Sequence, residues 1–377
     1  MKKYKNALLR WGLFFITLLV TTFAGMEWVA AKSILVDGFD IDGLKKGFLW
    51  YALPFLGFLT VHEFGHYFMA KIRKVSVTPP YYIPFWLAMT PSFGTMGAFI
   101  KINDLVNSRK KYFDIGIAGP LAGFVVALFA LIYGYSHLPD HTFVYAIHPE
   151  YAQYGTHYGD YVYDEESIAG ALRLGDSLLS HWIKITFADP ARMPHINELT
   201  HYPFILAGFL GLFFTALNLM PIGQLDGGHI LFSMLGPKWF NRVSPVLFTM
   251  FIFYAGLGFY TIEEMGQLLY LEGYRAILNF IVYVYVTYLS FSRMFEDRKL
   301  NWIMALSVII LQLLVNNFWP EAVGYSGFLA FGLLLGRFLG IYHPPVMSDK
   351  KLDFGRILLG IFALIIFVLC ISPAPFY

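Results

Sequence analysis

Long apolar runs constrain the fold of this sequence more than any other feature. They extend over about residues 8–31, 47–70, 112–135, 203–235 (interrupted), 243–262, 275–292, 302–318, 325–341 and 355–372. A helix needs about 20 apolar residues to cross the hydrocarbon core of a bilayer, so most of these runs are long enough to span one. Only 14% of the residues are charged, whereas soluble domains carry nearer a quarter. The sequence therefore predicts an all-α polytopic membrane protein with about nine transmembrane helices in a lipid bilayer.

The low charge content also limits the classes of partner. A net charge of +2 provides no basic surface for nucleic acid, so no nucleic-acid partner is expected. Cys370 is the single cysteine and lies in the last apolar run, which excludes an intramolecular disulfide and indicates a small buried residue. Nothing in the sequence indicates the oligomeric state.

Basic residues orient the expected helices. Four basic side chains within residues 2–10 place the N-terminus in the cytoplasm, and we interpret the long first run as a retained anchor helix. Alternation of the spans then puts the basic segments 71–74 and 108–111 in the cytoplasm. Residues 136–200, with nine acidic and three basic side chains, fall outside. Lys45 and Lys46 also fall outside, against the charge rule. We expect a prokaryotic inner membrane, because no transit peptide is evident.

Residues 76–100 do not read as a helix. They hold four prolines and two glycines in an otherwise apolar stretch, and the prolines exclude one continuous helix. Non-helical backbone is tolerated at membrane depth only where protein or water satisfies its polar groups. We therefore expect a membrane-associated, re-entrant loop.

One apolar run contains the pattern His-Glu-x-x-His, at His62, Glu63 and His66. Residues four apart share one face of a helix, so both imidazoles can reach a single metal ion. Glu63 borders this face and can act as a general base without ligating the metal, which is the spacing of zinc hydrolases. The alternative is three polar groups bonded to neighbouring helices, but burying them in a membrane is costly, so a catalytic role is favoured.

A catalytic zinc site usually has three protein ligands, so a third must come from elsewhere in the chain. The one carboxylate embedded in a later apolar run on the cytoplasmic side is Asp226, just after a helix break at Pro221 and Gly223. Asp226 could instead cap the helix that follows. His229 is a rival ligand, although its spacing from Asp226 favours an indirect role beside the metal.

The chain resembles the site-2 proteases, a family of intramembrane zinc metalloproteases. The matching segments are "HEFGH" at 62–66, "AGPLAG" at 118–123 and "NLMPIGQLDGG" at 218–228, in the family's order. The resemblance covers about residues 47–235 well and the later helices more loosely, and is strongest to the subgroup without a PDZ domain. It implies that His62, His66 and Asp226 bind Zn²⁺.

The same resemblance implies further roles. Glu63 would be the general base, and Asn218 would steady the oxyanion. Gly119 and Gly123 match a glycine motif of the family. The family's proline- and glycine-rich loop matches 76–100, whose end resembles a strand that could pair with an unwound substrate through the segment of Gly94, Gly97 and Phe99. Structural packing is the alternative for that strand.

These observations predict three regions: an N-terminal anchor helix with an outer loop (1–46), a site-2-protease-like core (47–235) and further transmembrane helices (236–377). The expected function is zinc-dependent hydrolysis of a peptide bond in or near a transmembrane segment of a protein substrate, as in regulated intramembrane proteolysis. One alternative is a non-hydrolytic transporter or chaperone on the same scaffold. Another is a different zinc hydrolase whose third ligand is not Asp226. The sequence does not name the substrate.

Overall fold

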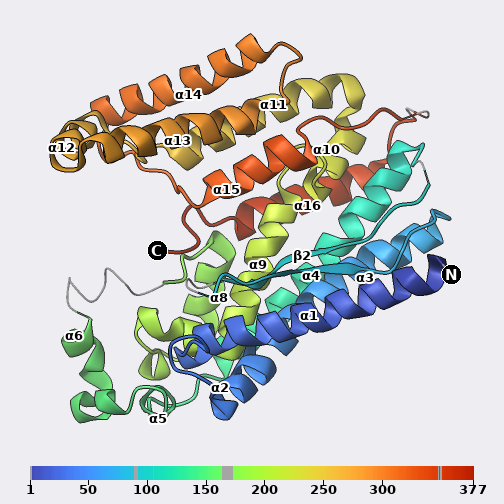
Figure 1. Cartoon of the computed structure of the whole chain (residues 1–377). Helices are drawn as coiled ribbons and strands as arrows, with labels where there is room; N and C mark the ends of the chain where they lie inside the picture. The colour runs from blue at the N-terminus through green and yellow to red at the C-terminus, as the bar shows by residue number, and fades with distance from the viewer. Residues whose placement is uncertain (1, 89–91, 105, 164–172, 347, 349) are drawn as a thin grey trace. The chain divides into compact units, whose positions relative to one another are not determined.

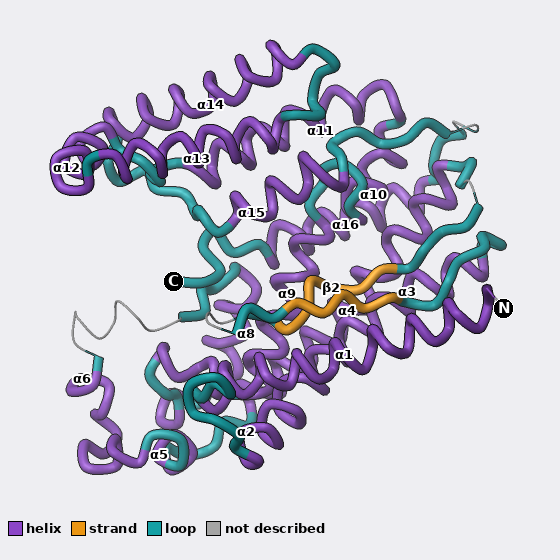
Figure 2. The backbone as a smooth tube through the Cα atoms, viewed as in Figure 1, coloured by secondary structure: helices purple, strands orange, loops and turns teal. Residues whose placement is uncertain are grey.

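A computed structural model describes residues 2–88, 92–104, 106–163, 173–346, 348 and 350–377. These residues are mainly helical and include one short strand hairpin (Figures 1 and 2). They form two compact units, one made of Met1–Val106, Asp114–Asn218 and Ile365–Tyr377, and the other of Asn107–Phe113 and Leu219–Leu364. The mainly helical fold that the sequence predicts is confirmed.

The first unit contains most of the chain's first half. Its elements are α1 (Lys2–Ala30), α2 (Ile41–Lys46), η1 (Gly47–Ala52), α3 (Leu53–Ile72), β1 (Tyr81–Phe85), β2 (Gly94–Phe99), most of α4 (Arg109–Ser136), α5 (Thr142–Tyr145), η2 (Pro149–His157), α6 (Tyr158–Val162), α8 (Leu178–Phe187), η3 (Pro190–Arg192), η4 (Ile196–His201) and α9 (Pro203–Leu219).

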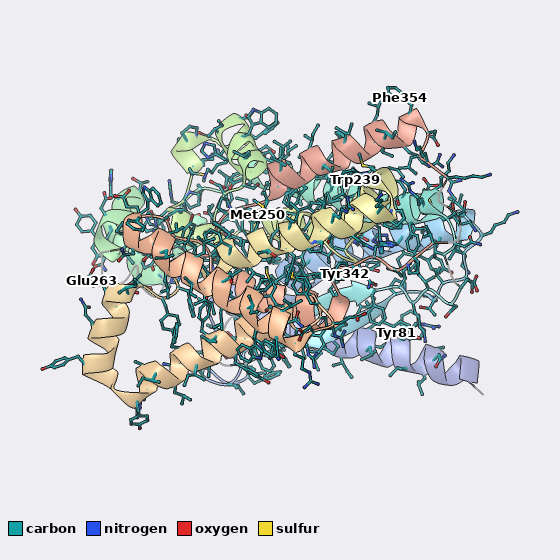
Figure 3. All side chains as sticks on the ribbon, turned by 90° about the horizontal axis from the view of Figure 1, so that it is seen from above. Tyr81, Trp239, Met250, Glu263, Tyr342 and Phe354 are labelled. Carbon is teal, nitrogen blue, oxygen red and sulfur yellow. The ribbon has the colours of Figure 1, made fainter. Side chains whose placement is uncertain are left out.

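The second unit is built from helices and their connections. They are α10 (Asp226–Leu235), α11 (Pro237–Gly256), α12 (Ile262–Glu272), α13 (Tyr274–Phe291), α14 (Arg298–Phe318), α15 (Phe328–Leu333), η5 (Leu334–Leu339) and most of α16 (Phe354–Cys370). Large apolar side chains such as Trp239 and Met250 on α11 and Phe354 on α16 are mostly exposed (Figure 3), which suits contact with lipid.

Four helical segments among the described residues are long and apolar enough to cross a membrane: Asn6–Ala30, Arg109–Ser136, Tyr274–Phe291 and Arg298–Phe318. Three shorter apolar helices are Pro203–Leu219, Phe328–Leu339 and Phe354–Cys370. Each of the apolar runs in the sequence falls largely on helix, because a helix satisfies its backbone polar groups internally. The total of nine transmembrane helices stays a prediction.

Two glycines let the first helix approach the helix that leads into α3. A Cβ on Gly25 would lie 2.5 Å from the carbonyl oxygen of Gly47, and a Cβ on Gly47 would lie 2.4 Å from that of Thr22. Only glycine permits backbones to pack this closely. The contact joins α1 to η1, which continues directly into α3.

The proline-rich loop contains the only sheet in the described part of the chain. β1 and β2 pair antiparallel, with Tyr81 opposite Phe99 and Phe85 opposite Gly94. The pairing is irregular between Tyr82 and Pro84, as expected where a proline cannot donate to the ladder. The hairpin packs on α1 (Figure 1). The expected strand-like segment is therefore present, while residues 89–91 of this loop lie outside the described residues.

The described residues of the acidic segment 136–200 form short helices, while residues 164–172 lie outside the described part. The best capped of these helices is α8 at Leu178–Phe187. Ser177 caps this helix, since its side chain accepts a hydrogen bond from the Ser180 amide. The later element η4 packs against α1 within the first unit.

Candidate metal centre

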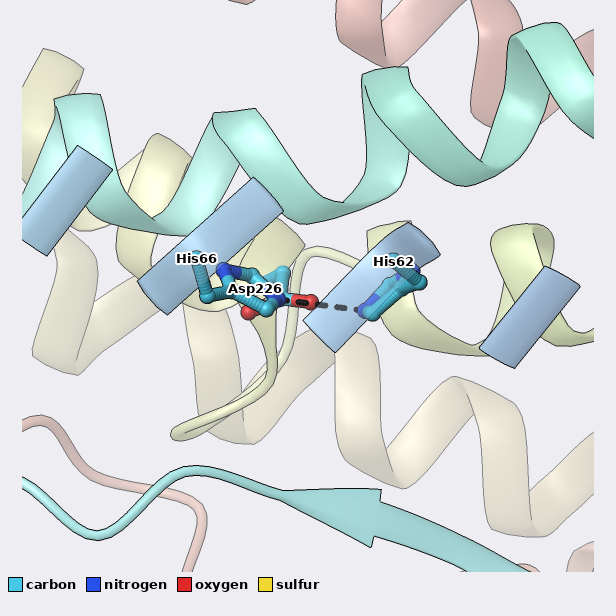
Figure 4. A group of neighbouring side chains, drawn as sticks. All are labelled: His62, His66 and Asp226. Atoms are coloured by element: carbon cyan, nitrogen blue, oxygen red, sulfur yellow. Dashed lines mark hydrogen bonds between the residues drawn. The ribbon is translucent and has the colours of Figure 1, made fainter. Parts of the chain in front are cut away.

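The histidine pair lies on α3, together with the glutamate between its members. His62, Glu63 and His66 are 2%, 5% and 6% exposed, so all three are buried in a helix that is otherwise apolar. One helical turn separates the two imidazoles, and their Nε2 atoms lie 3.1 Å apart (Figure 4). The helix therefore brings together the two side chains that the sequence pattern pairs.

A backbone carbonyl determines which nitrogen of the His66 ring carries the hydrogen. The oxygen of Ile115 lies 2.7 Å from His66 Nδ1, and a carbonyl oxygen can only accept, so Nδ1 donates. In the neutral ring Nε2 is then an acceptor, and it faces Nε2 of His62. The two nitrogens must share a proton or bind a common cation. A backbone carbonyl on the remote nitrogen is also the usual support of a metal-binding histidine.

Two glycines of α4 make room for these rings. A Cβ on Gly119 would lie 2.1 Å from His66 Nε2, and a Cβ on Gly123 would lie 3.2 Å from His62 Nδ1. A third close approach involves Gly65 of α3, whose Cβ would lie 2.6 Å from the Ala118 carbonyl oxygen. The glycine motif of the sequence thus has a physical reason, because larger residues would displace the imidazoles.

Asp226 follows a tight turn between α9 and α10. Gly223 adopts φ +58°, the left-handed region that glycine tolerates, and its amide donates to the Ser244 hydroxyl. A Cβ on Gly227 would lie 1.9 Å from the Leu219 carbonyl oxygen. The N-cap of α10 is Leu225, so Asp226 is the first helical residue and not the cap that the sequence left as an alternative. A carboxylate in this first turn is favourable for the helix dipole.

The two histidines are the part of the expected metal site that lies within the first unit, since Asp226 belongs to the second. The role of Asp226 as third ligand stays a prediction. Two nitrogens bound to one tetrahedral zinc at its usual bond lengths are about 3.3 Å apart, close to the separation of the two Nε2 atoms. Two imidazoles and one carboxylate are also a donor set that zinc prefers, so the residue types of the expected site suit the metal.

The rival ligand His229 contacts two aromatic side chains of its own unit. Its Nδ1 lies 2.8 Å from His343 Nε2, and its ring stacks on Tyr112. The choice between Asp226 and His229 as the third ligand stays a prediction.

The remaining candidate residues have the following positions. Asn218 is half-buried in the last turn of α9. Gly94, Gly97 and Phe99 lie on β2, where Phe99 is about half exposed and stacks on Tyr81 of the paired strand. Gly94 packs against α1, since its Cβ would lie 2.3 Å from Thr21 Cα. Catalytic or substrate-binding roles for these four residues stay predictions.

Comparison with known proteins places the chain in a family. The family model described as Peptidase family M50 matches residues 50–262, more than half of the chain. The chain belongs to peptidase family M50. This match includes the His-Glu-x-x-His helix, α4, α9 and the turn with Asp226. The expected membership of the site-2 protease family is thereby confirmed.

Curated relatives of this M50 chain are plant proteins. It is 28% identical over 252 residues to the probable zinc metalloprotease EGY2, chloroplastic, of Oryza sativa subsp. indica, which covers 61% of this chain and 41% of the relative. It is 30% identical over 183 residues to the probable zinc metalloprotease EGY1, chloroplastic, of Arabidopsis thaliana, covering 48% and 28%. The chain thus spans about two fifths or less of the length of these relatives. No solved structure matches.

These names agree with the expected zinc dependence and with the expected class of metallopeptidase. The chloroplast location is part of the relatives' names alone. One contact of the site could not be predicted from the sequence. The carbonyl of Ile115 is a backbone group, so no residue type marks it, and only the close packing that Gly119 permits could have suggested it.

Proposed function

We propose that this M50 chain is an intramembrane zinc metalloprotease that hydrolyses a peptide bond in or near a transmembrane segment of a protein substrate. The observation that carries the proposal is the buried pair of imidazoles with Nε2 atoms 3.1 Å apart and Glu63 between them. Buried ionisable groups in an apolar helix are expensive and mark functional sites. The family and the relatives' names support the same reaction class.

In this proposal His62, His66 and Asp226 hold the zinc. When bound, zinc would act as a Lewis acid on the scissile carbonyl and the attacking water. Glu63 takes the proton from that water and passes it to the leaving amine. The amide of Asn218 donates to the carbonyl oxygen as it gains negative charge.

The hairpin supplies the proposed substrate platform. A peptide bond within a helix is shielded by the helix's own hydrogen bonds, so the substrate must unwind before hydrolysis. An extended segment could then add to β2 near Gly94, Gly97 and Phe99, with main-chain hydrogen bonds replacing those of the helix. Exposure of Phe99 and Met96 on this strand supports the idea, as does the short two-stranded sheet.

The orientation of the chain is part of the proposal. The basic residues near the N-terminus and at the end of α3 favour a cytoplasmic N-terminus and an active site toward the cytoplasm. The membrane in this proposal is a prokaryotic inner membrane. Tagging each terminus and testing its protease protection in sealed vesicles would check the N-terminal side.

Three proteins test the proposed chemistry: the wild-type chain, Glu63→Gln and Asp226→Ala, each purified in detergent. Zinc bound per chain and cleavage of a membrane-protein substrate are measured together. Glu63→Gln should keep its zinc and lose activity by about 100-fold or more, whereas Asp226→Ala should lose zinc from this site. Full activity of Glu63→Gln would rule out the mechanism and favour a non-hydrolytic role for the scaffold.

A further inference from the structure

A second group of metal-type side chains lies in the acidic segment, wholly within the first unit. It consists of His148, which directly precedes η2, and of Glu198 and His201 on η4. One ligand-type atom from each lies within 4.8 Å of the others. His201 and Glu198 are buried, at 7% and 0% exposed, and His148 is partly buried. This group is separate from the residues that the proposed protease site uses.

The three atoms have the spacing of ligands around one small cation. His148 Nε2 lies 3.3 Å from His201 Nε2, and Glu198 Oε2 lies 3.9 Å and 3.5 Å from these two nitrogens. The point equidistant from three atoms so arranged is about 2.1 Å from each, which matches the zinc bond lengths to imidazole and carboxylate. The observed placement therefore needs little change to accept a metal.

Neighbouring groups orient two of the three side chains. The carbonyl oxygen of Val29, at the end of α1, lies 3.0 Å from His201 Nδ1, so that nitrogen donates and Nε2 is left as an acceptor. The Tyr163 hydroxyl donates to Glu198 Oε1, which orients the carboxylate. These are the supports that metal ligands commonly have, a carbonyl behind an imidazole and a donor on a carboxylate.

One of these ligand atoms has no hydrogen-bond partner. The side chain of Glu198 is fully buried, and its Oε2 accepts no hydrogen bond from the described residues. A buried carboxylate oxygen left without a donor carries a large desolvation penalty. A cation at this point would satisfy the carboxylate.

We propose that His148, Glu198 and His201 form a second metal site that binds zinc or a similar divalent cation. The cation would join residues 53 positions apart in the sequence, His148 and His201. Because His201 is tied to the Val29 carbonyl, the site would also fasten the acidic segment to the end of α1. Cross-links that close long loops stabilise a fold by removing conformational freedom of the unfolded chain.

The experiment counts zinc per chain in the full-length protein, purified in detergent and equilibrated with Zn²⁺ before removal of excess metal. Wild type is compared with Asp226→Ala, His148→Ala and the double variant. Wild type should hold two zinc ions, each single variant one, and the double variant none. If the proposed protease site binds no zinc, wild type should hold one and His148→Ala none, so the two proposals fail separately.

Two further variants keep the result interpretable. Glu198→Gln keeps the volume and can still accept from Tyr163, but removes the charge, so it should release the same zinc ion without disturbing the fold. His157→Ala changes a 79% exposed histidine side chain of the same segment and should keep the wild-type metal content. Gel filtration verifies that each protein is folded. Wild-type zinc content in both His148→Ala and Glu198→Gln would overturn the proposal.

A spectroscopic readout separates this site from activity. Co²⁺ added to Asp226→Ala should give a visible absorption band from the remaining site, and the band should be lost when His148→Ala is added. A band that persists unchanged in the double variant would assign the cation to other residues and contradict the proposal.

Discussion

A Cβ on Gly119 of α4 would lie 2.1 Å from Nε2 of His66, so a side chain at this position would collide with the imidazole. The methyl group of an alanine cannot move away, because it is fixed to the backbone of a helix. The nearest available response is rotation or displacement of His66. A residue that performs no chemistry thus determines whether the imidazole of His66, a proposed metal ligand, can adopt its present position.

Gly119→Ala should therefore lose zinc from the proposed catalytic site and lose proteolytic activity together. Zinc content and cleavage rate of the purified protein measure both effects. Gly57→Ala is the matched control, because a Cβ on Gly57 of α3 would meet nothing within 4 Å. A Gly119→Ala protein with normal zinc and normal activity would show that His66 does not need its present position.

Gly227→Ala should disturb the turn that carries Asp226. The added Cβ would lie 1.9 Å from the Leu219 carbonyl oxygen, so the turn must open or the start of α10 must shift. Overpacking of this kind costs about 1–3 kcal/mol of stability. We expect a lower thermal midpoint and weaker zinc binding, measured by calorimetry and metal analysis.

The control for that variant is Gly266→Ala in α12, where a Cβ would meet nothing within 4 Å. This protein should keep the wild-type midpoint and zinc content. Equal midpoints for the two variants would contradict the close packing of the turn.

Phe99→Pro tests the proposed strand platform. Proline removes a backbone donor and fixes φ, so it should slow cleavage if main-chain pairing at β2 binds the substrate. Phe99→Leu keeps the donor and an apolar side chain, and it should remain close to wild type in cleavage rate. Zinc content should be normal in both. An unchanged rate for Phe99→Pro would exclude strand addition at this residue.

Arg109→Lys should destabilise the end of α10. The buried guanidinium donates from Nε and Nη2 to the Ser233 carbonyl at 3.0 and 2.7 Å, and from Nη2 to that of Met234 at 3.1 Å. A lysine cannot reproduce this fork, and the loss should cost about 1–3 kcal/mol. Thermal unfolding measures the change. Lys110→Ala should show little effect, because this side chain is partly exposed and forms only a surface ion pair with Asp353.

The sequence predicted the helix of His62 and His66 well, because four-residue spacing on a helix fixes a shared face without reference to tertiary structure. It also predicted the break before Asp226, since proline and glycine act on the local backbone. A strand at the end of the proline-rich loop was expected and is present as β2. Each of these features depends on residues that are close together in the sequence.

The features that could not be predicted depend on contacts between residues far apart in the sequence. The Ile115 carbonyl that orients His66 belongs to an unremarkable apolar residue. The group of His148, Glu198 and His201 left one weak trace, the Glu-x-x-His spacing at 198–201, while His148 is about 50 positions away. We expected residues 136–200 only as an outer loop. Short helices carry too few apolar repeats for the sequence pattern to show how they pack together.

The contact of Gly94 with Thr21 indicates that the first helix positions the hairpin as well as anchoring the chain in the membrane. β1 and β2 lie on α1, and with 2.3 Å between a Cβ at Gly94 and Thr21 Cα the hairpin has no room to slide along it. Gly25 and Gly47 tie the same helix to the segment that leads into α3. Helix α1 thus holds the hairpin at a fixed distance from the two histidines of α3. In the proposed function, the first helix would therefore determine which peptide bond of a substrate is cleaved.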